Sequence, residues 1–233
     1  MYLITQNFIS LEAVFDISIL KKVMYIGLPF AAEQLFFNGG KLLTQTFIVQ
    51  LGTLALTSFA IGNSIALLFQ IGPNALGIAI VTVVGQCIGK RNIQDARKFI
   101  FSLLGFSSIL FLIADAILLP LFPLLIKMFN PPDEIVPTIF TMTLISAITQ
   151  PTLWSLSFIM PSALRAAGDS NFTSIASLLS MWLLRVVLGN TLGITLGFGI
   201  IGVWVAMNVE WGMRGIIFFW RFKAKKWYAH RLV

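Results

Sequence analysis

The sequence has little charge and a single cysteine, and each scarcity excludes a class of protein. Charged residues make up 11% of the 233 residues and hydrophobic residues 58%, whereas a soluble domain carries about 25% charged residues. So few charges cannot coat a globule, which excludes a soluble enzyme and a disordered segment. Cys87 has no second cysteine to pair with, which excludes a secreted scaffold held together by disulfides.

Motifs that carry catalysis or bind metals are missing as well. The sequence has no glycine-rich phosphate loop, no His-Glu-x-x-His and no cysteine cluster. Its one histidine, His230, lies in a basic tail, where we expect contact with solvent or lipid headgroups only. We therefore predict that the protein is not an enzyme and holds neither a metal nor an organic cofactor.

Long apolar runs fill most of the chain. A helix needs about 20 apolar residues to cross the hydrocarbon core of a bilayer, and six runs reach this length. They cover residues 24–49, 56–88, 99–126, 135–160, 172–195 and 200–222. In the second run, Gly72-Pro73 predicts a kink, because proline removes a backbone donor. We predict an all-α membrane protein, with a six-helix lobe at 23–222 between an N-terminal segment at 1–22 and a basic tail at 223–233.

The basic residues predict how this lobe is oriented. The net charge is +7, which in a soluble protein would suggest nucleic acid, but here basic residues alternate with apolar runs. With six spans, both termini and the second and fourth connections share one side, which holds twelve Lys and Arg, whereas the other side holds only Lys127. The positive-inside rule then places both termini in the cytoplasm. We expect an integral protein of the plasma (inner) membrane, in contact with lipid and with no nucleic-acid partner.

Polar side chains recur at helical spacing in three of the six spans. The stripes are Gln34, Asn38, Lys41 and Gln45 in the first span, Asn63, Gln70 and Asn74 in the second, and Thr143, Ser146, Gln150, Trp154 and Ser157 in the fourth. Polar residues inside a span face protein or water rather than lipid. The stripes predict a shared wet cavity for solute, although hydrogen bonding between helices explains the same spacing. Trp154 either stacks on an aromatic or cationic solute or, as we prefer, packs between helices.

Ionisable side chains also lie inside the predicted spans, at Glu33, Lys41, Asp115, Arg185, Glu210 and Arg214. Each costs about 3 kcal/mol at the bilayer centre, so most must be paired, neutral or hydrated. Arg185 and Glu210 lie at similar depth on consecutive spans, which predicts a structural salt bridge, although Arg214 is also in reach of Glu210 on the same helix. Glu33 and Asp115 are candidate ion-coupling residues, because a desolvated carboxylate can take up a proton. The alternative for Glu33 is a hydrogen-bonded structural acid.

Several motifs, in this order, resemble the C-terminal half of the multidrug and toxic compound extrusion (MATE) family. They are Gly27-Leu28-Pro29, Glu33-Gln34, Val84-Gly85-Gln86 with Gly89, Ala163-Leu164-Arg165-Ala166-Ala167-Gly168-Asp169, Ser180-Met181-Trp182 with Arg185, and Gly202-Val203-Trp204. The similarity begins near Leu20 and covers nearly all of the remaining chain. The segment from Ala163 to Asp169 is its most specific part.

This resemblance implies one six-helix lobe of a twelve-helix transporter, whose first, second and fourth helices line a central cleft. It implies secondary active efflux of small organic, often cationic, solutes, driven by inward flow of H⁺ or Na⁺. It also implies a second six-helix lobe as partner, which is either an N-terminal half absent from this chain or a second copy. The alternatives are a six-helix membrane bundle that does not pump, and a lipid flippase of the same superfamily.

Overall fold

The computed structural model describes residues 17–224 and 227–228. Most of the predicted N-terminal segment and of the basic tail lies outside these residues. Within them, six long helical segments follow one another, with two short helices between the third and the fourth. The elements are α1 (Ile17–Gln50), α2 (Thr53–Gly89), α3 (Ile93–Leu118), α4 (Phe122–Phe129), η2 (Asp133–Ile135), α5 (Val136–Thr149), η3 (Gln150–Trp154), α6 (Ser155–Ala166), α7 (Ser170–Ser180), η4 (Met181–Leu188), η5 (Thr191–Thr195) and α8 (Gly199–Lys223).

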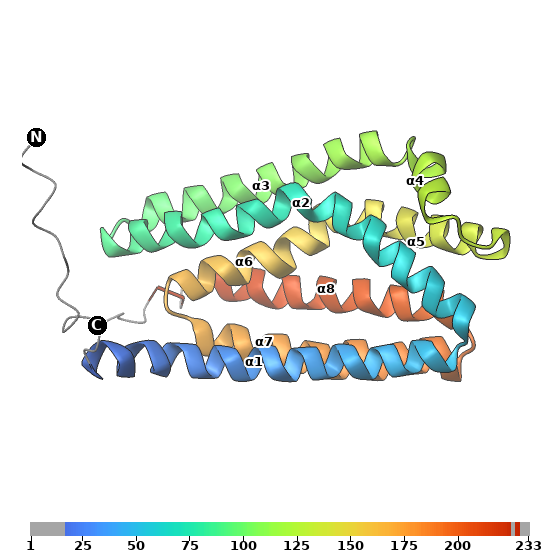
Figure 1. Cartoon of the computed structure of the whole chain (residues 1–233). Helices are drawn as coiled ribbons and strands as arrows, with labels where there is room; N and C mark the ends of the chain where they lie inside the picture. Colours follow the sequence, from blue (N-terminus) through green and yellow to red (C-terminus); the bar gives the residue numbers. More distant parts are fainter. Residues whose placement is uncertain (1–16, 225–226, 229–233) are drawn as a thin grey trace, which may run out of the picture.

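The six long segments confirm the predicted all-α lobe. Four described helical segments are long and apolar enough to cross a bilayer, namely Thr53–Gly89, Ile93–Leu118, Ser170–Thr195 and Gly199–Lys223. The other two predicted spans correspond to α1 and to residues 136–166, where the π-helical turn η3 separates α5 from α6. Pro73 lies inside α2, and this helix changes direction part-way along its length (Figure 1). The change of direction agrees with the predicted kink.

The third span differs from its prediction at both ends. The apolar run 99–126 suggested one helix, but α3 ends at Leu118 and α4 is a separate helix. Pro120 lies between the two helices and Pro123 in the first turn of α4, because proline fits a first turn but lacks the N–H that a helix interior needs. At its other end, α3 already begins at Ile93, where the Asn92 side chain accepts a hydrogen bond from the Asp95 N–H.

The chain directions bring the basic connections to one end of the lobe. Figure 1 shows α1 beginning and α8 ending at the same end, where the α2–α3 and α6–α7 turns also lie, whereas α4 lies at the opposite end. The α2–α3 turn carries Lys90 and Arg91, and Arg165 lies in the last turn of α6, next to the α6–α7 turn. This arrangement is the one that an even number of crossings predicts.

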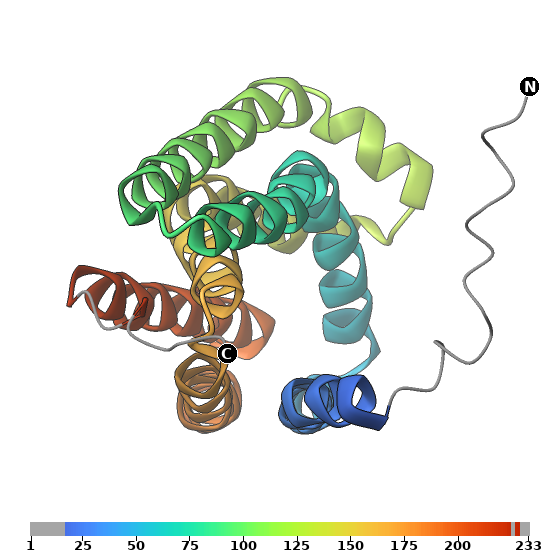
Figure 2. The same cartoon turned by 90° about the vertical axis from the view of Figure 1, so that its left-hand side faces the viewer.

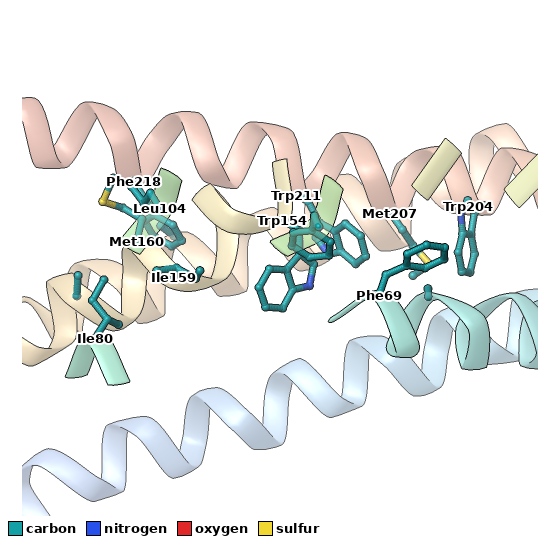
Figure 3. Close-up of a cluster of buried hydrophobic side chains, with 14 of the residues drawn as sticks. Phe69, Ile80, Leu104, Trp154, Ile159, Met160, Trp204, Met207, Trp211 and Phe218 are labelled. Atoms are coloured by element: carbon teal, nitrogen blue, oxygen red, sulfur yellow. The ribbon is translucent and has the colours of Figure 1, made fainter. Parts of the chain in front are cut away.

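The apolar core lies between α2, α3, α6 and α8. Figure 2 shows α6 running through the middle of the lobe and α1 at its rim, in contact with α7, η4 and α2. Figure 3 shows Trp154 and Trp211 among the buried side chains of the core. The Trp154 ring stacks on Phe158 with centroids 4.8 Å apart and meets the edge of Phe111 at 5.4 Å. These ring contacts place Trp154 in the packing between helices.

A candidate polar cavity and three buried ion-pair clusters

The stripe of the first span lies exposed on α1. Gln34, Asn38, Lys41 and Gln45 are all exposed, between the buried side of α1 and a side that carries Leu35 and Leu42. These two leucines are 72% and 65% exposed, as expected of a lipid-facing surface. The rim helix therefore carries an exposed polar strip beside an exposed apolar one.

A cavity of about 200 Å³ lies where α1, α2, η4 and α8 meet. It is lined by Lys41, Thr44, Gln45, Phe59, Asn63, Arg185 and Met207. The structure thus brings together residues from the stripes of the first and second spans and adds Arg185 from the fifth. Four other residues of these two stripes lie outside this lining. Gln34 and Asn38 are exposed near it along α1, Asn74 is exposed on α2, and Gln70 is buried.

The stripe of the fourth span faces the interior of the lobe, contrary to the expected cavity lining. Gln150 and Trp154 are 1% and 3% exposed and do not line the cavity. The stripe packs against α8 instead, where Trp204 Nε1 donates hydrogen bonds to the Met142 carbonyl at 3.0 Å and to Ser146 Oγ at 3.1 Å. Ser146 and Ser157 accept hydrogen bonds from Trp204 and Arg214 of α8, whereas the Gln150 side chain has no hydrogen-bond partner among the described residues. Hydrogen bonding between helices therefore accounts for part of this stripe.

A buried cluster of three charges joins the fifth and sixth spans. Arg185 Nη2 lies 2.7 Å from Glu210 Oε2, and Arg214 Nη1 lies 3.0 Å from Glu210 Oε1. Both ion pairs considered from the sequence are therefore present at once. Arg214 Nε also donates a 2.6 Å hydrogen bond to Ser157, and its guanidinium lies 4.5 Å from the Phe158 ring. One carboxylate thus compensates two buried arginines.

A second cluster fastens α1 to the α6–α7 turn. Glu33 is 3% exposed. Arg165 Nη2 donates to Glu33 Oε1 at 2.6 Å, and Ser174 Oγ donates to Glu33 Oε2 at 2.5 Å. Both carboxylate oxygens of Glu33 are engaged, and its role in ion coupling stays a prediction.

The third cluster joins the same turn to the last helix. Arg221 Nε and Nη2 donate to the two oxygens of Asp169, at 2.7 and 3.2 Å. Arg165 and Asp169 both belong to the most specific of the quoted motifs, so this motif connects the turn to α1 on one side and to α8 on the other. Asp115 is half-buried on α3, and the described residues offer its carboxylate no hydrogen bond or ion pair.

Comparison with known proteins identifies the family. Residues 29–191 match the family model described as MatE. The chain belongs to the MATE family. It is 29% identical over 213 residues to the uncharacterized transporter YisQ of Bacillus subtilis, covering 89% of this chain and 46% of YisQ. It is 25% identical over 209 residues to the probable multidrug resistance protein NorM of Thermotoga maritima, covering 89% of this chain and 44% of that relative.

Solved MATE structures share the fold. The MATE transporter ClbM in complex with Rb⁺ gives a TM-score of 0.78 at 20% identity, covering 91% of this chain and 50% of ClbM. A MATE crystal structure in the straight conformation gives 0.78 at 17% identity, covering 93% of this chain and 49% of that one. Identities this low establish the fold alone. The chain spans about half the length of the curated MATE relatives it matches, and it has the fold of half a MATE transporter.

Proposed function

We propose that this chain is one lobe of an exporter that moves small organic, often cationic, compounds out of the cytoplasm in exchange for H⁺ or Na⁺. Family membership supports transport, and the relative of Thermotoga maritima is named a probable multidrug resistance protein. The observation that carries the proposal is the exposed polar strip of α1, formed by Gln34, Asn38, Lys41 and Gln45. In a lobe surrounded by lipid on all sides, these polar side chains would face hydrocarbon, which is unfavourable.

The energetic cost of that strip supports a water-filled cleft facing a second lobe. A lysine costs about 3 kcal/mol at the centre of a bilayer, and Lys41 is exposed with further polar residues on the same strip. Water and a facing lobe would remove this cost. Because α1 begins and α8 ends at the same end of the bundle (Figure 1), a second lobe in the same orientation can pair with this one. Either a separate six-helix segment or a second copy related by a twofold axis would complete the cleft.

The proposed mechanism is alternating access. Solute and coupling ion exclude each other from the cleft, and rocking of the two lobes exposes it to either side in turn. The basic end of the lobe would face the cytoplasm. Glu33 and Asp115 are the candidate coupling acids.

Cysteine labelling tests whether the polar strip is hydrated. In a Cys87→Ser background, Asn38→Cys on the strip is compared with Leu35→Cys, its matched control on the apolar side of α1. A membrane-impermeant maleimide reacts with thiolate, which requires water, so in vesicles we expect Asn38→Cys to label at least about tenfold faster. Both variants should label alike after denaturation in detergent. Equal labelling rates in the intact membrane would place the strip in lipid.

Transport itself is tested in proteoliposomes that hold the full chain, alone or with any six-helix segment encoded beside it. Ethidium movement is followed with a proton gradient, with a sodium gradient and with neither. We expect movement that depends on one of the two gradients, and Glu33→Gln or Asp115→Asn to abolish that dependence if the residue couples. Ethidium movement that ignores both gradients would indicate a bundle that does not pump. Movement of a fluorescent phospholipid in place of ethidium would indicate a flippase.

A further inference from the structure

We propose that the cavity between α1, α2, η4 and α8 binds the anionic group of an amphipathic molecule, such as a carboxylate, sulfonate or phosphate on an apolar body. The inference concerns binding at equilibrium, so it stands or falls independently of the proposed export. It differs from the expectation of an often cationic solute and rests on the charges, donors and walls of this one cavity.

Positive charge is in excess around the cavity. Lys41 and Arg185 line it, and Arg214 shares the Glu210 carboxylate with Arg185. Three cations therefore face one carboxylate, and the ammonium of Lys41 has no ion pair among the described residues. It lies 5.0 Å from the centre of the Phe37 ring instead. Uncompensated charge of one sign favours a ligand of the opposite sign.

One buried N–H of Arg185 has no hydrogen-bond partner among the described residues. The residue is 5% exposed although it lines the cavity, and its Nε has no hydrogen-bond partner within the described part of the chain. A buried charged group with an unpartnered donor is unfavourable, so the Glu210 carboxylate leaves the guanidinium of Arg185 incompletely compensated. Arg185 also belongs to the π-helical segment η4, and π-helical turns occur frequently at functional sites.

The other walls suit a small polar group attached to an apolar body. Asn63 is only partly buried and adds an amide donor beside Lys41. Phe59 and Met207 form an apolar wall, and the Phe59 ring is held edge-on against Trp204 with centroids 5.7 Å apart. A simple organic cation fits the apolar wall but is repelled by Lys41 and Arg185, whereas an organic anion is attracted by both.

The test is equilibrium dialysis of the purified full chain in a neutral maltoside detergent against three probes that share one ring system. The probes are 1-naphthalenesulfonate, 1-naphthalenemethanol and 1-naphthylmethylammonium. We expect the sulfonate to bind about tenfold more tightly than the neutral alcohol, and the ammonium to bind most weakly. The proposal is overturned if the alcohol binds as tightly as the sulfonate, or if the ammonium binds more tightly than either.

Two lysine variants locate the binding. Lys41→Gln should weaken sulfonate binding about tenfold, because it removes one of the two cations that line the cavity. Its matched control is Lys127→Gln, an exposed lysine on α4 outside the cavity, which should leave binding unchanged. Because Lys41 is itself exposed, its replacement is compatible with folding. An equal effect of both variants would show attraction by overall charge and would reject the site.

Competition then identifies the source of the anion. Dihexanoyl-phosphatidylglycerol and sodium benzoate are each titrated against bound 1-naphthalenesulfonate, with dihexanoyl-phosphatidylcholine as the zwitterionic control. Displacement mainly by phosphatidylglycerol supports the site with an anionic lipid headgroup as occupant. Displacement mainly by benzoate supports it with a free organic anion. Failure of both anions to displace the probe contradicts the proposal.

Discussion

Replacing Glu210 with glutamine is expected to lower the free energy of unfolding of the lobe by about 3–5 kcal/mol. Glutamine keeps the shape of the side chain but removes the one carboxylate that Arg185 and Arg214 share. The guanidinium groups of these arginines are almost fully buried, with side chains 6% and 3% exposed, so both charges would remain in the interior without compensation. The loss is measured by heating the detergent-solubilised chain and following the folded fraction by size-exclusion chromatography.

Two further variants show whether the loss of stability comes from the unpaired arginines. Glu134→Gln is the matched control, because Glu134 is exposed in the short helix η2, and it should leave the melting temperature unchanged. Arg185→Met removes one cation and leaves Glu210 paired with Arg214, so it should cost less than Glu210→Gln. If Glu210→Gln melts like Glu134→Gln, the cluster is not an important source of stability.

Gly202→Ala is expected to destabilise the lobe by about 1–3 kcal/mol, although alanine favours helices over glycine. A Cβ at this position would lie 2.8 Å from the backbone carbon and oxygen of Leu192 and 2.9 Å from Cβ of Phe198. The Leu192 atoms belong to the backbone, and Cβ of Phe198 is bonded directly to it. None of them can move aside as the end of a flexible side chain can. The turn between η5 and α8 would have to open, which is measured as a lower melting temperature.

The same helix provides a control of the opposite sign. A Cβ at Gly212 would lie 3.5 and 3.6 Å from the Leu153 methyl groups, which is ordinary van der Waals contact. Gly212→Ala should therefore leave stability unchanged or raise it by up to about 1 kcal/mol through helix propensity. If both variants shift the melting temperature equally and in the same direction, close packing at Gly202 is not what excludes a side chain there.

The helical lobe could be predicted because hydropathy and proline placement are local signals. The break between α3 and α4 was missed because Leu119, Leu121 and Phe122 continue the apolar run, and hydropathy is equally high in a helix and in an apolar connection. Pro120, within the connection, and Pro123, in the first turn of α4, carried the information. The kink in α2 was foreseen from Pro73, whose missing N–H acts within its own helix.

Ion pairs could be predicted only between spans that are consecutive in the sequence. Arg185 and Glu210 were paired from their depth along two consecutive spans, because neighbouring helices in the chain usually run antiparallel and side by side. Glu33 and Arg165 are 132 residues apart, and their contact depends on α1 packing beside the α6–α7 turn. The motif that holds Arg165 was visible in the sequence, but its partner was not.

The sequence by itself determined that this is an all-α membrane lobe of six spans with its basic connections at one end. These properties follow from the local balance of apolar, charged and proline residues. Only the tertiary structure decided which polar stripes are exposed. Periodicity reveals that one side of a helix is polar, but the neighbouring helix decides what that side meets: α8 covers the stripe with Gln150, whereas the stripe with Lys41 lies at the rim and remains open.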